Sequence, residues 1–209
     1  MYNFYASAKQ DQFAANILDF KRDGYCVDIG SCYSIIANNT YFFQSLGWTS
    51  ITIEIDEIYN DSYKSRERGV HLNKNALEVN YKETFEEYEF PKSIDYLSLD
   101  IDALSLDVLK ILPLDEYRFK VITIEHDAYV HGDTYREQQR NLLNSYGYFL
   151  LCSNVYVEQS GYEGQECPFE DWWIDPSEFS NDLIEKIKCD STLPSVIISK
   201  FKRDSYGAS

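Results

Sequence analysis

The chain has 209 residues, of which 44% are hydrophobic and 16% aromatic, enough for one globular domain with a full core. The 35 acidic residues outnumber the 19 basic ones and give a net charge of −16, which argues against partners such as a nucleic acid or an anionic membrane surface. The five cysteines (Cys26, Cys32, Cys152, Cys167 and Cys189) lack a CxxC pair, which disfavours structural zinc and a disulfide framework. No apolar run reaches the roughly 20 residues of a membrane span, and no signal-peptide pattern follows Met1. These features predict a single domain over residues 1–209 in a reduced, cytoplasmic setting.

The first elements in chain order are a helix and then a strand–helix–strand unit. Residues 11–22 carry Phe13, Ile17 and Phe20 on one stripe, which predicts a helix that covers the sheet. The β-branched and apolar runs at 25–30 and 50–55 predict buried parallel strands, and residues 39–46 predict the helix between them. This order is typical of the opening of a nucleotide-binding type of α/β fold.

The remaining sequence continues the alternation of helices and strands. We expect helices or helical turns at 57–68, 84–90, 104–112 and 134–146, and strands at 70–72, 95–99, 120–124 and 148–152. Residues 153–169 predict a long loop over a cleft, and residues 171–174 predict an antiparallel seventh strand. The core then spans about 10–175, followed by an extension at 176–203 with a helix at 176–189 and an edge strand at 196–199, and by a frayed tail at 204–209.

Two strand ends carry the first signs of a ligand site. Gly30 follows Asp28 at the end of the first strand and leaves room for a ligand to approach the backbone. Glu54 ends the second strand at roughly the spacing of an acid that binds ribose hydroxyls. An ordinary solvated glutamate is the alternative for Glu54.

Several separated motifs, in one order and spacing, resemble the FkbM-type methyltransferase family between about Gln10 and Trp173. They are Val27-Asp-Ile-Gly30, Asn39-Thr-Tyr-Phe-Phe43, Gly47-Trp48, Ile51-Thr-Ile-Glu54, Asp95-Tyr-Leu-Ser-Leu-Asp-Ile-Asp102 and Val121-Ile-Thr-Ile-Glu-His126. The resemblance implies a Rossmann-like class I methyltransferase fold of the α/β class, with a seven-stranded, mostly parallel sheet in the order 3-2-1-4-5-7-6 and helices on both faces. It also implies S-adenosylmethionine as the cofactor.

The resemblance assigns the cofactor contacts to Asp28, Gly30, Ser31, Glu54, Ile55, Asn75, Ala76 and Asp100. The first three would hold the amino-acid end, Glu54 the ribose and Asn75 the adenine. Ser34 stands where the family has a second loop glycine, and Ser31 and Ser34 could donate hydrogen bonds to the cofactor carboxylate. For Asn75, a turn-forming role is the alternative.

Acidic residues are predicted to meet at the carboxyl ends of the strands, where ligands bind in open α/β sheets. Their repulsion requires a cation or a proton to offset it. By similarity to the catechol-type O-methyltransferases, Asp100, Asp102, Glu125 and Asp127 are candidate ligands of Mg²⁺. Without an ion His126 is the candidate general base, and Asp100, Glu125 and His126 are the candidate catalytic residues. The alternatives are a helix cap for Asp102, a loop acid for Asp127 and a buried structural role for His126.

The sequence therefore predicts an S-adenosylmethionine-dependent O-methyltransferase acting on a sugar or small-molecule hydroxyl. Tyr33, Tyr129, Trp172 and Trp173 are candidates to stack on the acceptor, although core packing fits the two tryptophans better. A catalytically inactive binding or assembly protein is the alternative, because Ser34 and Ala103 depart from the family pattern; it predicts a cofactor pocket filled by Tyr33 or Cys32. A nicotinamide enzyme is disfavoured because G-x-G-x-x-G is missing.

Overall fold

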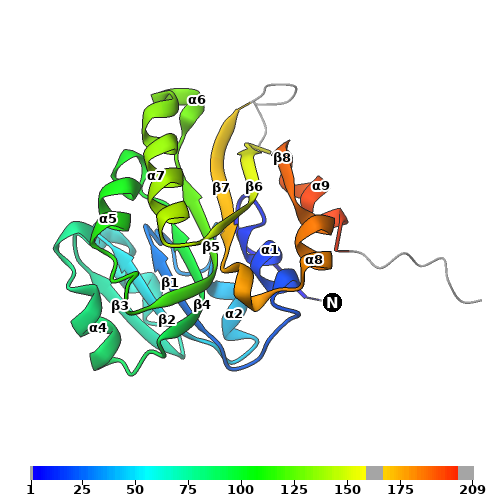
Figure 1. The fold of residues 1–209 in the computed structure, drawn as a ribbon. Coiled ribbons are helices and arrows are strands. Elements are labelled where there is room, and N and C mark those ends of the chain that lie inside the picture. The colour runs from blue at the N-terminus through cyan, green and yellow to red at the C-terminus, as the bar shows by residue number, and fades with distance from the viewer. Residues whose placement is uncertain (1, 159–166, 202–209) are drawn as a thin grey trace, which may run out of the picture.

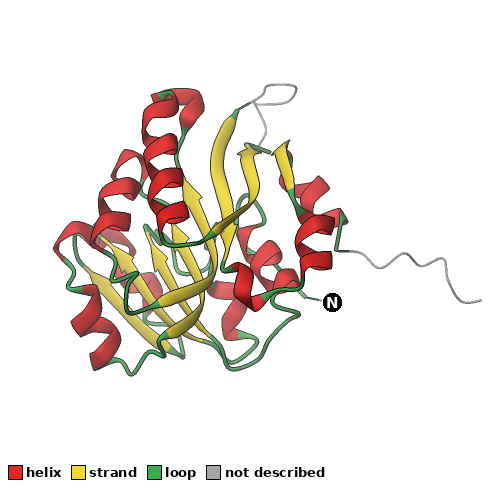
Figure 2. Ribbon diagram, in the orientation of Figure 1, coloured by secondary structure: helices red, strands yellow, loops and turns green. Residues whose placement is uncertain are grey.

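A single sheet organises the computed structural model, which describes residues 2–158 and 167–201 (Figures 1 and 2). Within these residues the strand order is β3-β2-β1-β4-β5-β7-β6-β8. The strands are β1 (Tyr25–Ile29), β2 (Thr49–Glu54), β3 (Gly69–Asn73), β4 (Ser93–Leu99), β5 (Arg118–Glu125), β6 (Phe149–Tyr156), β7 (Pro168–Ile174) and β8 (Cys189–Thr192). β7 runs antiparallel to β5 and β6, and the other pairings are parallel. The predicted order 3-2-1-4-5-7-6 is confirmed, with β8 added beyond β6.

Helices cover both faces of the sheet, as Figure 2 shows. They are α1 (Gln10–Ile17), α2 (Tyr41–Gln44), α3 (Asn60–Tyr63), α4 (Tyr81–Glu87), α5 (Ser105–Ile111), α6 (Ala128–His131), α7 (Asp133–Ser145), α8 (Asn181–Ile187) and α9 (Pro194–Ser199). Single 3-10 turns lie at Glu57–Tyr59, Ala76–Glu78, Asp102–Leu104 and Pro176–Glu178. Because the sheet is covered on both sides, its central strands are buried almost throughout, as predicted.

Two clusters of buried side chains separate the sheet from its two helical layers. One contains Phe85 of α4, Leu109 of α5 and Leu143 of α7. The other contains Phe13 of α1 and Ile197 of α9. The helical layers that flank these clusters lie on opposite sides of the sheet in Figure 1.

The C-terminal extension differs from its prediction. Residues 196–199, expected as an edge strand, belong to α9, and residues 189–192 form the edge strand instead, with Cys189 opposite Cys152 of β6. Pro194 occupies the first turn of α9, a position where its missing N–H costs no hydrogen bond. The expected helix at 176–189 is correspondingly divided into a 3-10 turn, α8 and the start of β8.

Other elements also begin or end at residues that differ from the prediction. The helix expected at 57–68 is limited to a 3-10 turn and α3, and α1 ends at Ile17, before Asp19 and Phe20 with positive φ. Of the loop expected at 153–169, the first residues belong to β6, which reaches Tyr156, and the last belong to β7, which begins at Pro168; residues 159–166 lie outside the described part of the chain. The tail expected at 204–209 lies outside the described residues.

The parallel register brings several strand ends to one edge of the sheet. Ile29 at the end of β1 lies opposite Ile53 of β2 and Leu99 of β4, and Leu99 lies opposite Ile124 of β5. The strand order reverses between the neighbouring strands β1 and β4, which is where an open α/β sheet forms its ligand crevice. The residues that follow these strands therefore face a common space.

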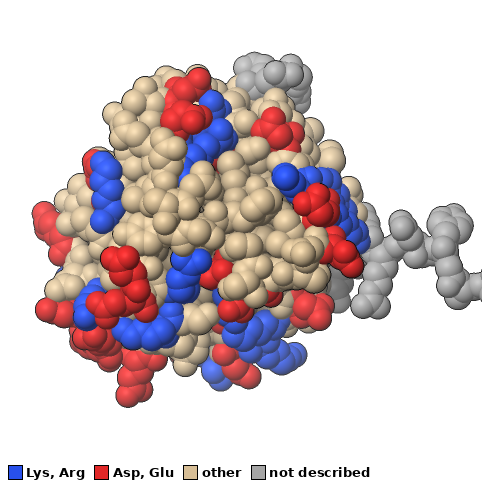
Figure 3. Space-filling model, viewed as in Figure 1, with Lys and Arg blue, Asp and Glu red and all other residues tan. Residues whose placement is uncertain are grey.

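Charged side chains are intermixed on the face drawn in Figure 3, where Lys and Arg lie beside Asp and Glu instead of forming a continuous basic stripe. None of the helices in the described ranges is long and apolar enough to cross a membrane.

Candidate functional site: two joined hollows at the strand ends

The acidic pocket, as we name the larger of two hollows at this edge, has a volume of about 500 Å³. Its walls come from the ends of β1, β4 and β5, from the N-terminal segment, and from residues at the end of β6 and the start of β7. They include Asp28, Gly30, Ser31, Asp100, Asp102, Glu125 and Asp127 together with Ser7, Gln10, Asn39, Tyr129, Glu158 and Phe169.

The side hollow, of about 310 Å³, lies toward β2 and the residues after β3. Glu54, Ile55, Asn75 and Ala76, all predicted to contact the cofactor, line it. It shares Gly30, Cys32, Asp100 and Asp102 with the acidic pocket, so the two hollows adjoin at the ends of β1 and β4, and we call them the joined hollows.

Asp28 lines the acidic pocket, and one of its two carboxylate oxygens has no hydrogen-bond partner among the described residues. Its Oδ2 accepts a hydrogen bond from the Thr40 hydroxyl at 2.8 Å, whereas its buried Oδ1 has no partner within the described structure. Burial raises the pKa of Asp28 to about 6, although the Thr40 hydrogen bond and the Arg66 charge oppose the shift. A buried carboxylate oxygen without a donor favours a cation or a strong donor beside it, which fits the ammonium group of an amino acid.

Glu54 is held by the backbone of two loops. Its Oε2 accepts the Cys32 N–H at 3.0 Å and its Oε1 accepts the Asp56 N–H at 2.9 Å. Each carboxylate oxygen can accept a further hydrogen bond, so these contacts fix the group without exhausting it. Cys32 reaches Glu54 with a φ of 44°, a left-handed conformation that is uncommon outside glycine.

Gly30 is required by the sheet itself. Its φ is 83°, and a Cβ at this position would lie 1.9 Å from the Asp100 carbonyl oxygen. Asp100 thus occupies the position that a side chain would need, while Gly30 lines both hollows, and its contact with a ligand stays a prediction.

The serines of the following loop bond mainly to protein groups. The Ser31 hydroxyl donates a long hydrogen bond of 3.4 Å to the Ile53 carbonyl. Ser34 uses both of its polar groups on Ser62, because its N–H donates to the Ser62 hydroxyl and its own hydroxyl donates to the Ser62 carbonyl. Ser31 lies in the lining of the acidic pocket, but Ser34 does not appear in either of the joined hollows.

Asn75 caps a turn and also lies at the side hollow. Its side-chain oxygen accepts the Leu77 N–H at 3.0 Å and thereby caps a 3-10 turn, as the turn-forming alternative predicts. It also lines the side hollow, next to Ala76. Its adenine contact stays a prediction.

Four carboxyl groups meet at the ends of β4 and β5. Asp100 and Glu125 share a hydrogen bond, and burial together with their mutual repulsion raises the pKa of Glu125. Burial also raises the pKa of Asp100 and of Asp127. Two buried carboxyl groups in contact favour holding one proton between them.

Oxygen atoms of Asp102, Glu125 and Asp127 lie within 4.8 Å of one another. This all-oxygen set suits a hard divalent cation such as Mg²⁺. Asp100, the fourth candidate ligand, bonds to Glu125 and is not part of this close group among the described residues.

His126 is not brought into either of the joined hollows. Its side chain is fully buried; Nδ1 accepts the Ala128 N–H at 3.1 Å, and Nε2 lies 3.5 Å from an Asp171 carboxylate oxygen. The prediction that His126 faces the reacting group therefore has no support from its position, and the imidazole sits in the buried, structural role given as its alternative.

Of the four aromatic residues predicted to stack on the acceptor, one lines the joined hollows and three do not. Tyr129 lines the acidic pocket, whereas Tyr33 is half exposed and packs edge-on against Tyr59. Trp172 and Trp173 are fully buried, as core packing predicts. Tyr33 is absent from the lining of both joined hollows, so it does not plug the space beside Glu54 as an inactive protein was predicted to do.

Several lining residues were not predicted from the sequence. The N-terminal segment supplies Ser7, Ala8 and Gln10, and Gln10 donates a hydrogen bond to buried Glu170 at 3.3 Å. Asn39, which begins one of the motifs that resemble the FkbM family, donates to the Ser98 hydroxyl at 2.8 Å and also bonds Asp100. Its place in that motif was the one sequence feature that could have identified it as a site residue.

Comparisons with known proteins support the fold. No family model matches the sequence, and no curated protein matches it either. Among solved structures, a provisionally named O-methyltransferase from Klebsiella pneumoniae is 14% identical, with a TM-score of 0.54 over 81% of this chain and 80% of its own. Fibrillarin from Aeropyrum pernix, solved with natively bound S-adenosyl-L-methionine, is 10% identical, with a TM-score of 0.51 over 80% and 76%. A provisionally named hemolysin from Streptococcus thermophilus is 12% identical, with a TM-score of 0.56 over 96% and 74%. At these identities the chain shares the class I methyltransferase fold, and the FkbM resemblance stays a prediction.

Proposed function

We propose that the chain is an S-adenosylmethionine-dependent methyltransferase that methylates a hydroxyl of a sugar or another small molecule. The observation that carries the proposal is the joined pair of hollows, with the unsatisfied Asp28 oxygen at one end and Glu54 beside the other. The FkbM resemblance implies the same orientation of the cofactor, with its amino-acid end at Asp28 and its ribose at Glu54. Such a cofactor requires an anionic group for its ammonium and hydrogen-bond acceptors for its ribose hydroxyls.

In this proposal Asp28 holds the ammonium group of the cofactor, and Ser31 lies near its carboxylate. Glu54 accepts hydrogen bonds from the ribose, while Ile55, Asn75 and Ala76 border the adenine. S-adenosylmethionine supplies an already activated methyl group, so the protein has mainly to align the acceptor and exclude water.

The acceptor hydroxyl is proposed to bind near Asp100 and Glu125. Burial and mutual repulsion favour one proton shared by these two carboxyl groups, and their remaining negative charge would receive the hydroxyl proton as the oxygen–methyl bond forms and the sulfur–methyl bond breaks. In the alternative with a bound ion, Asp102, Glu125 and Asp127 would hold Mg²⁺ in place of the shared proton, and the ion would lower the pKa of a nearby hydroxyl.

A catalytically inactive assembly protein is the second candidate, because Ala103 and Ser34 depart from the FkbM pattern. The open side hollow beside Glu54 counts against it, since that candidate predicted a filled pocket.

Calorimetry with S-adenosylhomocysteine tests cofactor binding without requiring the acceptor. We expect saturable binding that Glu54→Ala weakens and Asp107→Ala, an exposed control on α5, leaves unchanged. Transfer of a labelled methyl group to a panel of sugars and small alcohols then tests the acceptor class. Absence of cofactor binding at millimolar concentration would reject the enzymatic proposal.

A further inference from the structure

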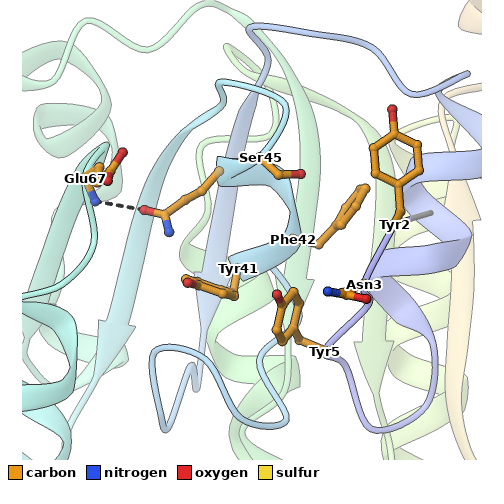
Figure 4. Close-up of a pocket in the computed structure, with 8 residues that line it drawn as sticks. Tyr2, Asn3, Tyr5, Tyr41, Phe42, Ser45 and Glu67 are labelled. Atoms are coloured by element: carbon orange, nitrogen blue, oxygen red, sulfur yellow. Dashed lines mark hydrogen bonds between the residues drawn. The ribbon is translucent and has the colours of Figure 1, made fainter.

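A separate hollow of about 410 Å³ lies between the N-terminal segment and α2, where Figure 4 shows Tyr2, Asn3, Tyr5, Tyr41 and Phe42 around it. Gln44, Ser45 and Glu67 complete its lining, and we name it the tyrosine hollow. It shares no lining residue with the acidic pocket or the side hollow.

Ring contacts hold the aromatic walls in place. Tyr5 meets Tyr41 edge to face, with ring centroids 4.7 Å apart and an interplanar angle of 85°, so the two rings form a corner. The Arg66 guanidinium lies 5.4 Å from the centroid of the Tyr41 ring. Tyr2 stacks on Phe20 at 5.0 Å yet remains 49% exposed. Aromatic rings that are fixed but accessible offer apolar surface at a low entropic cost of binding.

The polar groups around these rings are largely uncommitted. In the described structure no hydrogen bond engages the hydroxyls of Tyr2, Tyr5 and Tyr41, the Asn3 amide, the Ser45 hydroxyl or the Glu67 carboxylate. The Gln44 side-chain oxygen accepts the Glu67 N–H at 2.8 Å, which leaves the amide NH₂ group of Gln44 available. The lining thus offers donors, acceptors and groups that can act as either.

We propose that the tyrosine hollow binds a neutral saccharide. Saccharide hydroxyls each donate and accept hydrogen bonds, which matches the mixed polar lining, and the C–H faces of a sugar ring pack against exposed tyrosine rings. An anionic ligand is disfavoured because Glu67 is the charged residue of the lining, and no Lys or Arg joins it among the described residues. The volume falls in the usual range for small-molecule sites. This inference does not depend on the proposed methyltransferase activity.

Saturation-transfer NMR with maltose, cellobiose and lactose tests the proposal directly. We expect saturation transfer from the full chain to at least one of these disaccharides, and a Kd that Tyr5→Ala raises about tenfold or more. Tyr135→Ala, which removes an exposed tyrosine of α7 remote in sequence from the hollow, should leave the Kd unchanged.

Asn3→Ala and Glu67→Gln provide milder changes at exposed positions if Tyr5→Ala does not fold, and we expect each to weaken binding severalfold. The proposal is overturned if none of the three disaccharides gives transfer, or if the variants of the hollow bind as tightly as the Tyr135→Ala control. Binding of an uncharged tyrosine-containing tripeptide in place of all three sugars would also overturn it. Because S-adenosylhomocysteine binds elsewhere in our account, its calorimetric titration reports the methyltransferase proposal independently.

Discussion

Asp28→Asn should move stability and cofactor affinity in opposite directions. The pKa of Asp28 is about 6 in the folded protein, against 3.8 for an unperturbed aspartate, so its ionised form is disfavoured by about 3 kcal/mol at pH 8. The folded protein holds the proton more tightly, and this effect therefore reduces stability as pH rises from about 4 to about 6. We expect Asp28→Asn to raise the free energy of unfolding by roughly 1–3 kcal/mol at pH 8 and to change it little at pH 4.

Urea unfolding at the two pH values measures this difference. The asparagine also loses the charge that we assign to the cofactor ammonium, and S-adenosylhomocysteine should bind about tenfold or more weakly at pH 8. Asp107→Asn makes the same chemical change at an exposed site and should alter neither quantity. Loss of stability together with unchanged affinity would refute our account of Asp28.

The remaining predictions concern three other positions. Gly30→Ala should destabilise the protein by roughly 2–4 kcal/mol, measured by urea unfolding, because its Cβ would overlap the Asp100 carbonyl; wild-type stability would contradict the close approach of β1 and β4. His126→Asn should lower stability by about 1–3 kcal/mol through the lost Ala128 contact, yet leave S-adenosylhomocysteine affinity unchanged in calorimetry; selective loss of affinity would instead place His126 in the site. Hydrogen bonding from Cys152 and the Lys200 charge lower the pKa of Cys189 to about 7, whereas burial and Glu54 raise the pKa of Cys32 to about 12. Alkylation followed by mass spectrometry should therefore label Cys189 before the more exposed Cys32 at pH 8, and the reverse order would contradict these environments.

The sheet could be predicted because its central strands depend on local patterns. Val27 and Ile51 lie in short β-branched runs that are buried on both faces, and such runs identify strands without knowledge of their neighbours. The edge strand at Cys189–Thr192 could not be found in this way. Its residues are polar apart from Cys189, and their conformation depends on pairing with β6.

The candidate site was predictable to the extent that it follows strand ends. Asp28, Glu54, Asp100 and Glu125 lie at the expected edge because parallel register aligns those ends. The direction of a side chain just beyond a strand is set by local backbone geometry, and sequence does not specify it. His126 thus turns toward Asp171, and Asp127, with a φ of 45°, lines the pocket. Ser7 and Gln10 reach the pocket from a distant segment without any motif.

A crystal structure with S-adenosylhomocysteine tests the central claim most directly. Our account predicts continuous density through both joined hollows, with the amino group beside Asp28, the ribose hydroxyls on Glu54 and the adenine next to Asn75. Density at another surface, or hollows that stay empty at saturating ligand, would contradict it.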